Sequence, residues 1–487
     1  MVAALVRTAP HQPRSPKSGC SISGLQQGTL SLPKALGLAV VTFSPVLMAA
    51  TAPALAGGVA GANAWLSVLA GTALVTFIGM AIVPFARRYV VSGALYSYIG
   101  HELGPKASAV AGASLAVGYA AGVIVCLQVF GVYAGSFFAT IFDLPAANGL
   151  GGQTIMWMLA MLSITWFAIR GLDTSTRLSI GLLFVSAPIV AIVLVSNLFT
   201  DGFAFGEQFN FGGFTLSGFF LGIVMSATFF VGFESSAATA LETKNPMRTV
   251  PRLMTLVPLI VGSVGVIATL LTVPVLPDIA DATATGESPL SAMANNAGLG
   301  VLAPVADLFL AIICYAVVLG FMNYAPRVWA TMAVDGMLPK YLAHVDEKRH
   351  TPVRAIVAIA VLSTIVPIAL AGFSGGTPLE VYTHVAALFP YYWVIPYVLI
   401  CVGAIVMLAR RRELRAGMVF VCVIGATGIG YVWLSAVLSP TGTSLDAMTW
   451  AAPITIALAL LVVVPIRMQF NRRSRKAQSE VPADEVG

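Results

Sequence analysis

Long apolar runs account for most of this chain of 487 residues. They have the length that an α-helix needs to cross the hydrocarbon core of a bilayer. Only 9% of the residues are charged, while 58% are hydrophobic, whereas a soluble domain carries about a quarter charged residues. The sequence therefore predicts an all-α polytopic membrane protein with about twelve transmembrane helices, over residues 35–56, 64–86, 107–139, 153–170, 178–199, 214–241, 253–275, 301–334, 355–372, 382–409, 416–438 and 448–466.

Basic residues gather on one side of this predicted topology. The loops 57–63, 140–152, 200–213, 276–300, 373–381 and 439–447 contain Asp and Glu but no Lys or Arg. The other loops and both tails are basic. Arg170 is the last residue of one predicted span, and Arg327 alone falls further inside one, near its inner end. Cytoplasmic loops carry the excess of Lys and Arg, so both termini are expected in the cytoplasm and the protein in the plasma membrane. The net charge of +6 thus reflects topology and gives no support to nucleic-acid binding.

Two of the spans are interrupted at matching places. Pro45 lacks an amide hydrogen and disrupts the first span, and Gly232 breaks the sixth. Paired broken helices in two halves of a chain indicate a midplane binding site between inverted repeats. Their ends expose amides for an anionic group and carbonyls for a cationic one, and a zwitterionic α-amino acid has both groups.

Glu234 places a carboxyl group at membrane depth, directly after the second break. An ionisable residue within a span is costly and is a functional candidate by default. The alternative is that Gly232 only allows close helix packing and that Glu234 snorkels or pairs with a neighbour.

Three motifs follow one another on the predicted inner side. They are Gly93-Ala-Leu-Tyr-Ser-Tyr98 with Glu102-Leu-Gly104, Gly232-Phe-Glu234 with Glu242-Thr-Lys-Asn-Pro-Met-Arg248, and the segment from Asn323 to Pro339. Together they resemble the signature segments of the amino acid–polyamine–organocation (APC) superfamily of permeases. The resemblance implies the LeuT-type fold, with helices 1–5 and 6–10 as inverted repeats and two peripheral helices. It also implies secondary transport of amino acids or related amines.

The resemblance and the hydropathy together divide the chain. Residues 1–34 are expected to be a disordered cytoplasmic tail, residues 35–466 the transporter domain, and residues 467–487 a second cytoplasmic tail. Within the domain, residues 35–199 would form the first repeat, 214–409 the second, and 416–466 helices eleven and twelve.

The two breaks suggest a set of substrate-binding residues. The first-helix stretch with Thr42, Ser44, Pro45 and Val46 is expected to hold the substrate carboxylate with its amides. Carbonyls from Phe229 to Gly232 are expected to hold the ammonium group, and Thr228 to tune side-chain selectivity. Phe230 and Phe321 are candidate lids, since an aromatic ring can close a cavity and face a cation; plain packing is the alternative.

Acidic residues near the inner ends of the helices are expected to close the inner gate. Glu102, Glu242 and Asp335 lie near inner-side cations in the sequence, where exposed pairs would each contribute little stability. Asn323 and Arg327 are expected to secure the inner end of helix eight rather than to touch substrate.

The coupling ion is expected to be the proton. The resemblance places a sodium site on hydroxyl groups of helix eight, but residues 308–328 contain no Ser or Thr. Burial disfavours the charged form of a carboxyl group, so Glu234 could exchange a proton as an ammonium group binds nearby. A polyamine or organic-amine carrier and an amino acid exchanger remain the alternatives.

Other classes of function find little support in the sequence. A channel would need a continuous polar pore lining, and an enzyme a cluster of catalytic or metal-binding residues. Neither pattern occurs, so no metal and no cofactor are expected. The expected partners are the amino acid, protons and the lipid bilayer, and the oligomeric state stays open.

Overall fold

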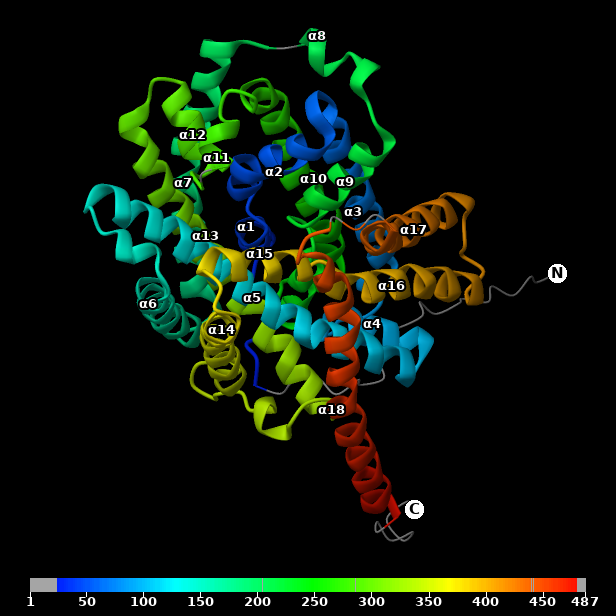
Figure 1. The fold of residues 1–487 in the computed structure, drawn as a ribbon. Helices are drawn as coiled ribbons and strands as arrows, with labels where there is room; N and C mark the ends of the chain where they lie inside the picture. The colour runs from blue at the N-terminus through cyan, green and yellow to red at the C-terminus, as the bar shows by residue number, and fades with distance from the viewer. Residues whose placement is uncertain (1–23, 204, 285, 439, 441, 480–487) are drawn as a thin grey trace, which may run out of the picture.

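The structure is a computed structural model that describes residues 24–479 apart from residues 204, 285, 439 and 441 (Figure 1). Every named element in this range is a helix, and the one pairing of extended backbone is an isolated bridge between Leu30 and Thr243. Ten helical stretches are long and apolar enough to cross a membrane. The predicted all-α membrane protein is therefore confirmed.

The twelve predicted spans can be matched to these helices. One apolar stretch, Leu32–Ala86, has 55 residues and holds two spans, because a helix rises about 1.5 Å per residue and the bilayer core is about 30 Å thick. It folds as α1 (Leu32–Thr42), α2 (Pro45–Ala60) and α3 (Ala64–Ala86). The sixth span is interrupted into α9 (Leu216–Ala227) and the 3₁₀-helix η4 (Phe233–Glu242).

Most of the remaining spans are longer than predicted, while the eighth begins two residues later than predicted and the eleventh has the predicted bounds. They are α5 (Pro105–Ile141), α6 (Leu150–Ile169), α7 (Leu172–Asp201), α10 (Pro246–Thr272), α13 (Ala303–Val334), α14 (Val353–Ser374), α15 (Pro378–Leu388) with α16 (Tyr391–Arg410), α17 (Ala416–Leu438) and α18 (Asp446–Ser479). The short helix α4 (Ala94–Leu103) precedes α5. Three more short helices, α8 (Phe205–Gln208), α11 (Ala280–Ala284) and α12 (Pro289–Asn296), lie in loops at the end of the molecule away from α4 (Figure 1).

The tenth span differs from its prediction as one helix over residues 382–409. It begins at Pro378 and divides into α15 and α16 around Phe389 and Pro390. Proline has no amide hydrogen to donate and its ring clashes with the preceding turn. Pro390 therefore bends this span, which gives three interrupted helices rather than two.

Each of several helix contacts between the two halves of the domain has an equivalent contact in which the roles of the halves are reversed. α10 packs on α2 as α3 packs on α9, and α13 packs on α6 as α5 packs on α14. Likewise, α13 packs on α7 as α5 packs on α16. This pattern is the one that inverted repeats produce when helices 1–5 correspond to helices 6–10. We therefore propose residues 35–199 and 214–409 as the two repeats.

The end of the expected N-terminal tail is ordered, contrary to the expectation of disorder up to residue 34. Leu25 and Leu30 are buried, and α1 begins at Leu32. The Leu30 amide donates to the Glu242 carbonyl at 2.8 Å, and the Lys244 amide donates to the Leu30 carbonyl at 2.8 Å. These bonds fix the segment against the end of η4. Residues 1–23 of the expected tail lie outside the described range.

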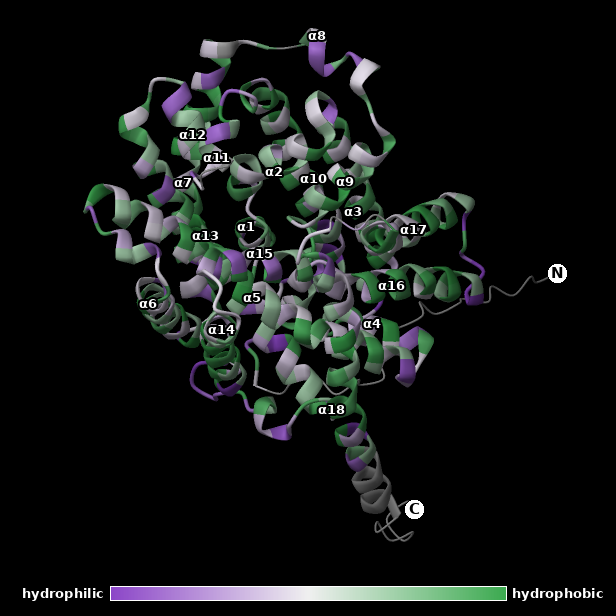
Figure 2. Ribbon diagram, viewed as in Figure 1, coloured by the Kyte–Doolittle hydropathy of each residue, from purple (hydrophilic) through white to green (hydrophobic). Residues whose placement is uncertain are grey.

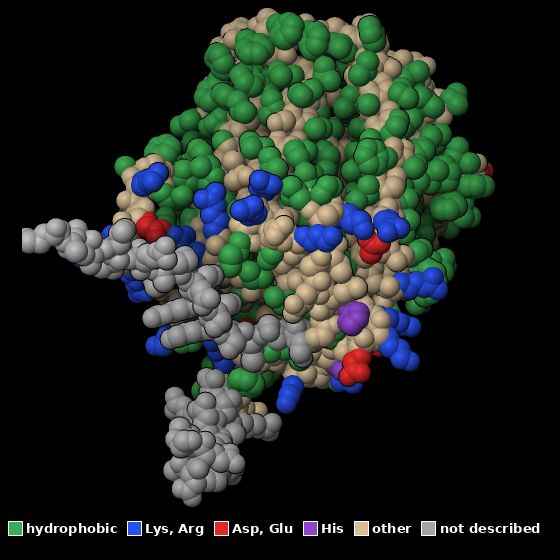
Figure 3. Space-filling view, turned by 180° about the vertical axis from the view of Figure 1, so that it is seen from behind, with side chains coloured by type: hydrophobic (Ala, Val, Ile, Leu, Met, Phe, Trp, Pro, Cys, Tyr) green, Lys and Arg blue, Asp and Glu red, His purple; other side chains and the backbone are tan. Residues whose placement is uncertain are grey.

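Polar and charged residues lie at the ends of the helices rather than along them. Figure 2 shows hydrophobic residues along α14, α16 and α17 and hydrophilic residues in the connecting loops. In the view from behind, Lys and Arg side chains gather over one end of the molecule, while the other end is mainly hydrophobic (Figure 3). We call the former the basic end. Ion pairs with Glu413 and Glu102 bring Arg88, Arg410 and Arg411 together.

A buried ion pair joins η4 to α13 near the basic end. Arg327 donates from Nε and Nη2 to the two Glu242 carboxylate oxygens, at 2.5 and 2.9 Å, and from Nη1 to the Asn323 carbonyl. The Arg327 and Glu242 side chains are 1% and 3% exposed. The expectation of a weak exposed pair at Glu242 is therefore wrong, because the bidentate pair is sealed from water. Arg327 and Asn323 do secure this end of helix eight, as predicted: Ser175 of α7 donates to Asn323.

We predict that Arg327→Met lowers the stability of the folded protein by about 3–5 kcal/mol, because Glu242 is left as an uncompensated buried charge. Thermal unfolding in detergent measures this change. Lys34→Met is the matched control, since the Lys34–Asp173 pair is 39% and 52% exposed and such pairs contribute about 1 kcal/mol or less. Arg327→Met combined with Glu242→Leu should recover most of the loss. An equal loss in the double variant would contradict this account.

Candidate functional site

A cavity of 430 Å³ lies where the interrupted first and sixth helices meet. It is lined by residues of the α1–α2 junction, α5, the end of α9, α13 and the α15–α16 junction. Thr383 and Leu445 also line it, and Leu445 belongs to the loop 439–447, which the sequence predicts on the side without Lys or Arg. A volume of this size is within the range of small-molecule sites.

Five of the predicted site residues line this cavity: Thr42, Ser44, Thr228, Phe229 and Phe321. The structure thus brings together the first, sixth and eighth helices as the sequence predicted. The other predicted residues, Pro45, Val46, Phe230, Gly232 and Glu234, are not among its lining residues. Phe230 is 1% exposed and packs in the core, so in this conformation its side chain does not cover the cavity.

Aromatic rings lie where the cavity approaches Gly232, while Thr228, Phe229 and Val231 of the sixth-helix break line the cavity themselves. Phe43 and Phe321 meet edge to face, with ring centroids 5.6 Å apart. A Cβ atom added to Gly232 would lie 3.5 Å from Phe43, 3.6 Å from Phe321 and 3.4 Å from Trp393. Gly232 therefore faces the rings of Phe43 and Phe321, which line the cavity, without lining it itself.

The first-helix break leaves one backbone amide at the start of α2 without a partner inside the turn, that of Val46. Ser44 is the N-cap residue, and its Oγ accepts a hydrogen bond from the Leu47 amide at 3.2 Å. Pro45 has no amide hydrogen, and the Met48 amide bonds to the Ser44 carbonyl. The first turn of a helix favours an anionic group. Ser44 lines the cavity, whereas Val46 does not.

The sixth-helix break depends on Gly232. Its φ is +92°, a conformation that glycine adopts without strain and other residues rarely adopt. The Phe233 amide bonds to the Phe230 carbonyl, and the Ser235 amide bonds to the Gly232 carbonyl. These two carbonyls, which were predicted to face the substrate ammonium group, are thus engaged within the turn. The Gly232 amide donates to the Tyr397 hydroxyl at 3.0 Å.

Glu234 is fully buried and is held by three neutral donors. Tyr119 of α5 donates to Oε1 at 3.1 Å, and Trp393 of α16 donates to the same oxygen at 2.8 Å. Tyr397, also of α16, donates to Oε2 at 2.5 Å. We call Tyr119, Trp393 and Tyr397 the Glu234 cage. The cage joins the third, sixth and tenth helices, and Tyr397 links the carboxyl group directly to the Gly232 amide.

The sequence did not reveal the cage residues. Tyr119 is 115 residues from Glu234, Trp393 is 159 and Tyr397 is 163, so no local spacing connects them. Aromatic residues in membrane helices most often pack or lie near interfaces. The sequence indicated only that a buried carboxylate at Glu234 needs hydrogen-bond donors, and not which residues supply them.

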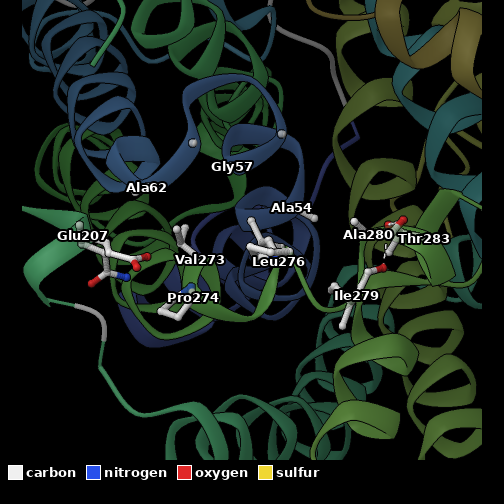
Figure 4. Close-up of a pocket in the computed structure, with 14 residues that line it drawn as sticks. Ala54, Gly57, Ala62, Glu207, Val273, Pro274, Leu276, Ile279, Ala280 and Thr283 are labelled. Atoms are coloured by element: carbon white, nitrogen blue, oxygen red, sulfur yellow. Dashed lines mark hydrogen bonds between the residues drawn. The ribbon is translucent and has the colours of Figure 1, made fainter. Parts of the chain in front are cut away.

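A larger hollow, of 520 Å³, lies between α2 and η5 (Val273–Val275) at the end opposite the basic end (Figure 4). Figure 4 shows Glu207 on one side and Thr283 on the other, with Val273 and Leu276 between them. Its lining includes no residue of either helix break. The smaller cavity, which is lined by residues of both breaks, therefore remains the candidate site.

Comparisons with known proteins agree with this geometry. The chain matches the amino acid permease family over residues 34–463. It is 26% identical to the branched-chain amino acid permease BcaP of Lactococcus lactis over 332 residues, which is 63% of this chain and 68% of that protein. It is also 26% identical to the cadaverine/lysine antiporter of Escherichia coli K12 over 279 residues, 56% of this chain and 60% of the antiporter.

A solved structure with the same fold supports the architecture. A mutant form of the manganese transporter of Eremococcus coleocola superposes with a TM-score of 0.60, at 11% identity, over 94% of this chain and 99% of the other. At this identity the likeness shows the fold alone, and that fold is the predicted LeuT-type arrangement. Since the family match covers most of the chain, the protein belongs to the amino acid permease family, whose members are membrane transporters rather than enzymes.

Proposed function

We propose that this protein is a secondary active transporter that moves amino acids across the plasma membrane together with protons. The observation that carries this proposal is the cavity at the junction of the two interrupted helices. It is lined by Ser44 at the start of α2 and by the residues that end α9, in a chain of the amino acid permease family. In this arrangement the substrate carboxylate binds at the first turn of α2, and the ammonium group binds at the turn that follows α9.

The conformation supports access from the end opposite the basic end. The cavity reaches residues of that end, such as Leu445, and the Phe43 and Phe321 rings lie between it and Gly232. The buried Arg327–Glu242 pair holds η4 and α13 together near the basic end. Transport then requires the rings to part and the inner ends of the helices to separate, while the outer side closes over the substrate.

Proton coupling is supported by the position of Glu234. Its cage contains no cation, so burial of its negative charge is offset by hydrogen bonds alone. Gaining a proton would change which atoms donate within the cage. Tyr397 also accepts the Gly232 amide, so this change reaches the backbone at the helix break. Two ligands that act on one equilibrium affect each other reciprocally, which is the requirement for coupling a proton to an amino acid.

Exchange of one amine for another is the second candidate. The similarity to the cadaverine/lysine antiporter favours it. In an exchanger the helices would rearrange only with a substrate bound, and Glu234 would have a structural role. Net accumulation driven by a proton gradient distinguishes the two candidates.

The topology has its own test. With the basic end in the cytoplasm, tags at both termini should be accessible only from the cytoplasmic side of intact cells. Protease or labelling reagents added to cells before and after permeabilisation measure this. Labelling of either terminus in intact cells would contradict the twelve-span topology.

Gly232→Leu should abolish uptake by inserted protein. A leucine at φ +92° is strained, and its side chain would meet Phe43, Phe321 and Trp393. Uptake of labelled amino acids into proteoliposomes measures the effect. Gly181→Leu is the matched control, because Gly181 lies in α7 with nothing within 4 Å of its added Cβ. Normal uptake by Gly232→Leu at normal expression would place the site elsewhere.

Glu234→Gln keeps the shape of the side chain and removes its titration. Proton-driven accumulation should collapse, while exchange of internal for external substrate partly survives. Both are measured in proteoliposomes with and without a proton gradient. Accumulation driven by a sodium gradient alone, and unchanged in Glu234→Gln, would rule out the proposed coupling.

A further inference from the structure

We infer that the cavity selects amino acids with uncharged, apolar side chains and disfavours both cationic substrates and acidic ones. This inference rests on the proposed function and names its substrate class. It is carried by the charge, the hydrogen bonding and the shape of the cavity wall.

The cavity provides no charged partner for a substrate side chain. None of its lining residues is Asp, Glu, Lys, Arg or His. A charge moved from water into such a site is costly unless it is paired and hydrogen-bonded. The buried carboxyl group of Glu234 does not line the cavity, and its oxygens already accept from the cage. The side-chain ammonium of lysine, or the second amine of a diamine, would therefore be left unpaired.

The threonine hydroxyls of the wall have already used their hydrogen atoms. Thr42, Thr51, Thr228 and Thr383 each donate to the carbonyl four residues earlier in their own helix, at 2.7, 2.7, 3.3 and 2.8 Å. They can accept a hydrogen bond from a substrate but cannot also donate one. A carboxylate side chain, which only accepts, therefore finds few donors, since Ser44 and the tyrosines of the lining add at most one hydroxyl hydrogen each.

Most of the other lining residues are apolar. Three helices supply one side of this apolar wall, with Val125, Cys126 and Val129 of α5, Val224 and Met225 of α9, and Val317 of α13. Apolar side chains placed against this wall leave water and gain free energy in proportion to the area buried. Met225 is flexible enough to adapt to side chains of different shape. This wall suits a branched or long apolar side chain.

Competition experiments on the unmodified protein test the inference. Proteoliposomes would take up labelled leucine in the presence of unlabelled competitors. Isoleucine, valine, methionine and phenylalanine should compete at concentrations at least about tenfold lower than lysine, cadaverine or glutamate, since tenfold corresponds to the loss of a single modest interaction. Equal or better competition by lysine, cadaverine or glutamate would overturn the inference and leave amino acid transport intact. If the liposomes take up neither leucine nor any other amino acid, the proposed function itself fails.

Two pairs of variants test the reason for the selectivity. Cys126→Asp and Met225→Glu each add a carboxylate to the apolar wall, and Cys126→Asn and Met225→Gln are neutral controls of matched shape. At least one acidic variant should gain competition by lysine or cadaverine at least about tenfold over its neutral control. Monodispersity in detergent shows which variants are folded. If folded acidic variants compete with lysine no better than their neutral controls, charge does not set the selectivity and the inference is wrong.

Discussion

A backbone that leaves its helix inside a bilayer must find partners for its amides and carbonyls within the protein. The sixth span meets this requirement at Gly232, where the chain turns with φ +92° and the amide bonds to Tyr397. Tyr397 in turn donates to Glu234. The opening of the helix is therefore stabilised by a side chain from α16 and by a buried carboxyl group. The cavity, the packing of the Phe43 and Phe321 rings near Gly232 and the proposed coupling all depend on this arrangement.

Two buried carboxyl groups of η4 have opposite surroundings, and the contrast indicates their roles. Glu242 is paired bidentately with Arg327, so its charge is compensated by a buried cation. Glu234, eight residues earlier, is held only by neutral donors. The proposed coupling therefore involves Glu234, while Glu242 is proposed to hold the two helices together.

The sequence predicted the class of fold because its strongest signals are local. Hydropathy located the spans, the basic loops indicated which side of the membrane each loop lies on, and Pro45 and Gly232 marked two of the interrupted helices. The bend at Pro390 was missed because prolines are frequent in membrane helices and one alone indicates little. The Glu234 cage and the burial of Arg327 could not be derived, since each depends on helices that are far apart in the sequence. Phe230 was expected at the cavity, but Phe43, one residue before the Ser44 cap, lines it instead. Which of these side chains faces the cavity depends on how the helices pack.

An amino acid is proposed to bind at the junction of the interrupted first and sixth helices. An experimental structure of the protein with a bound amino acid is the most direct test. We expect substrate density in the cavity lined by Ser44, Thr228 and Phe321, with the carboxylate at the first turn of α2 and the ammonium group at the turn after α9. Density in the hollow between α2 and η5, with this cavity empty, would contradict it.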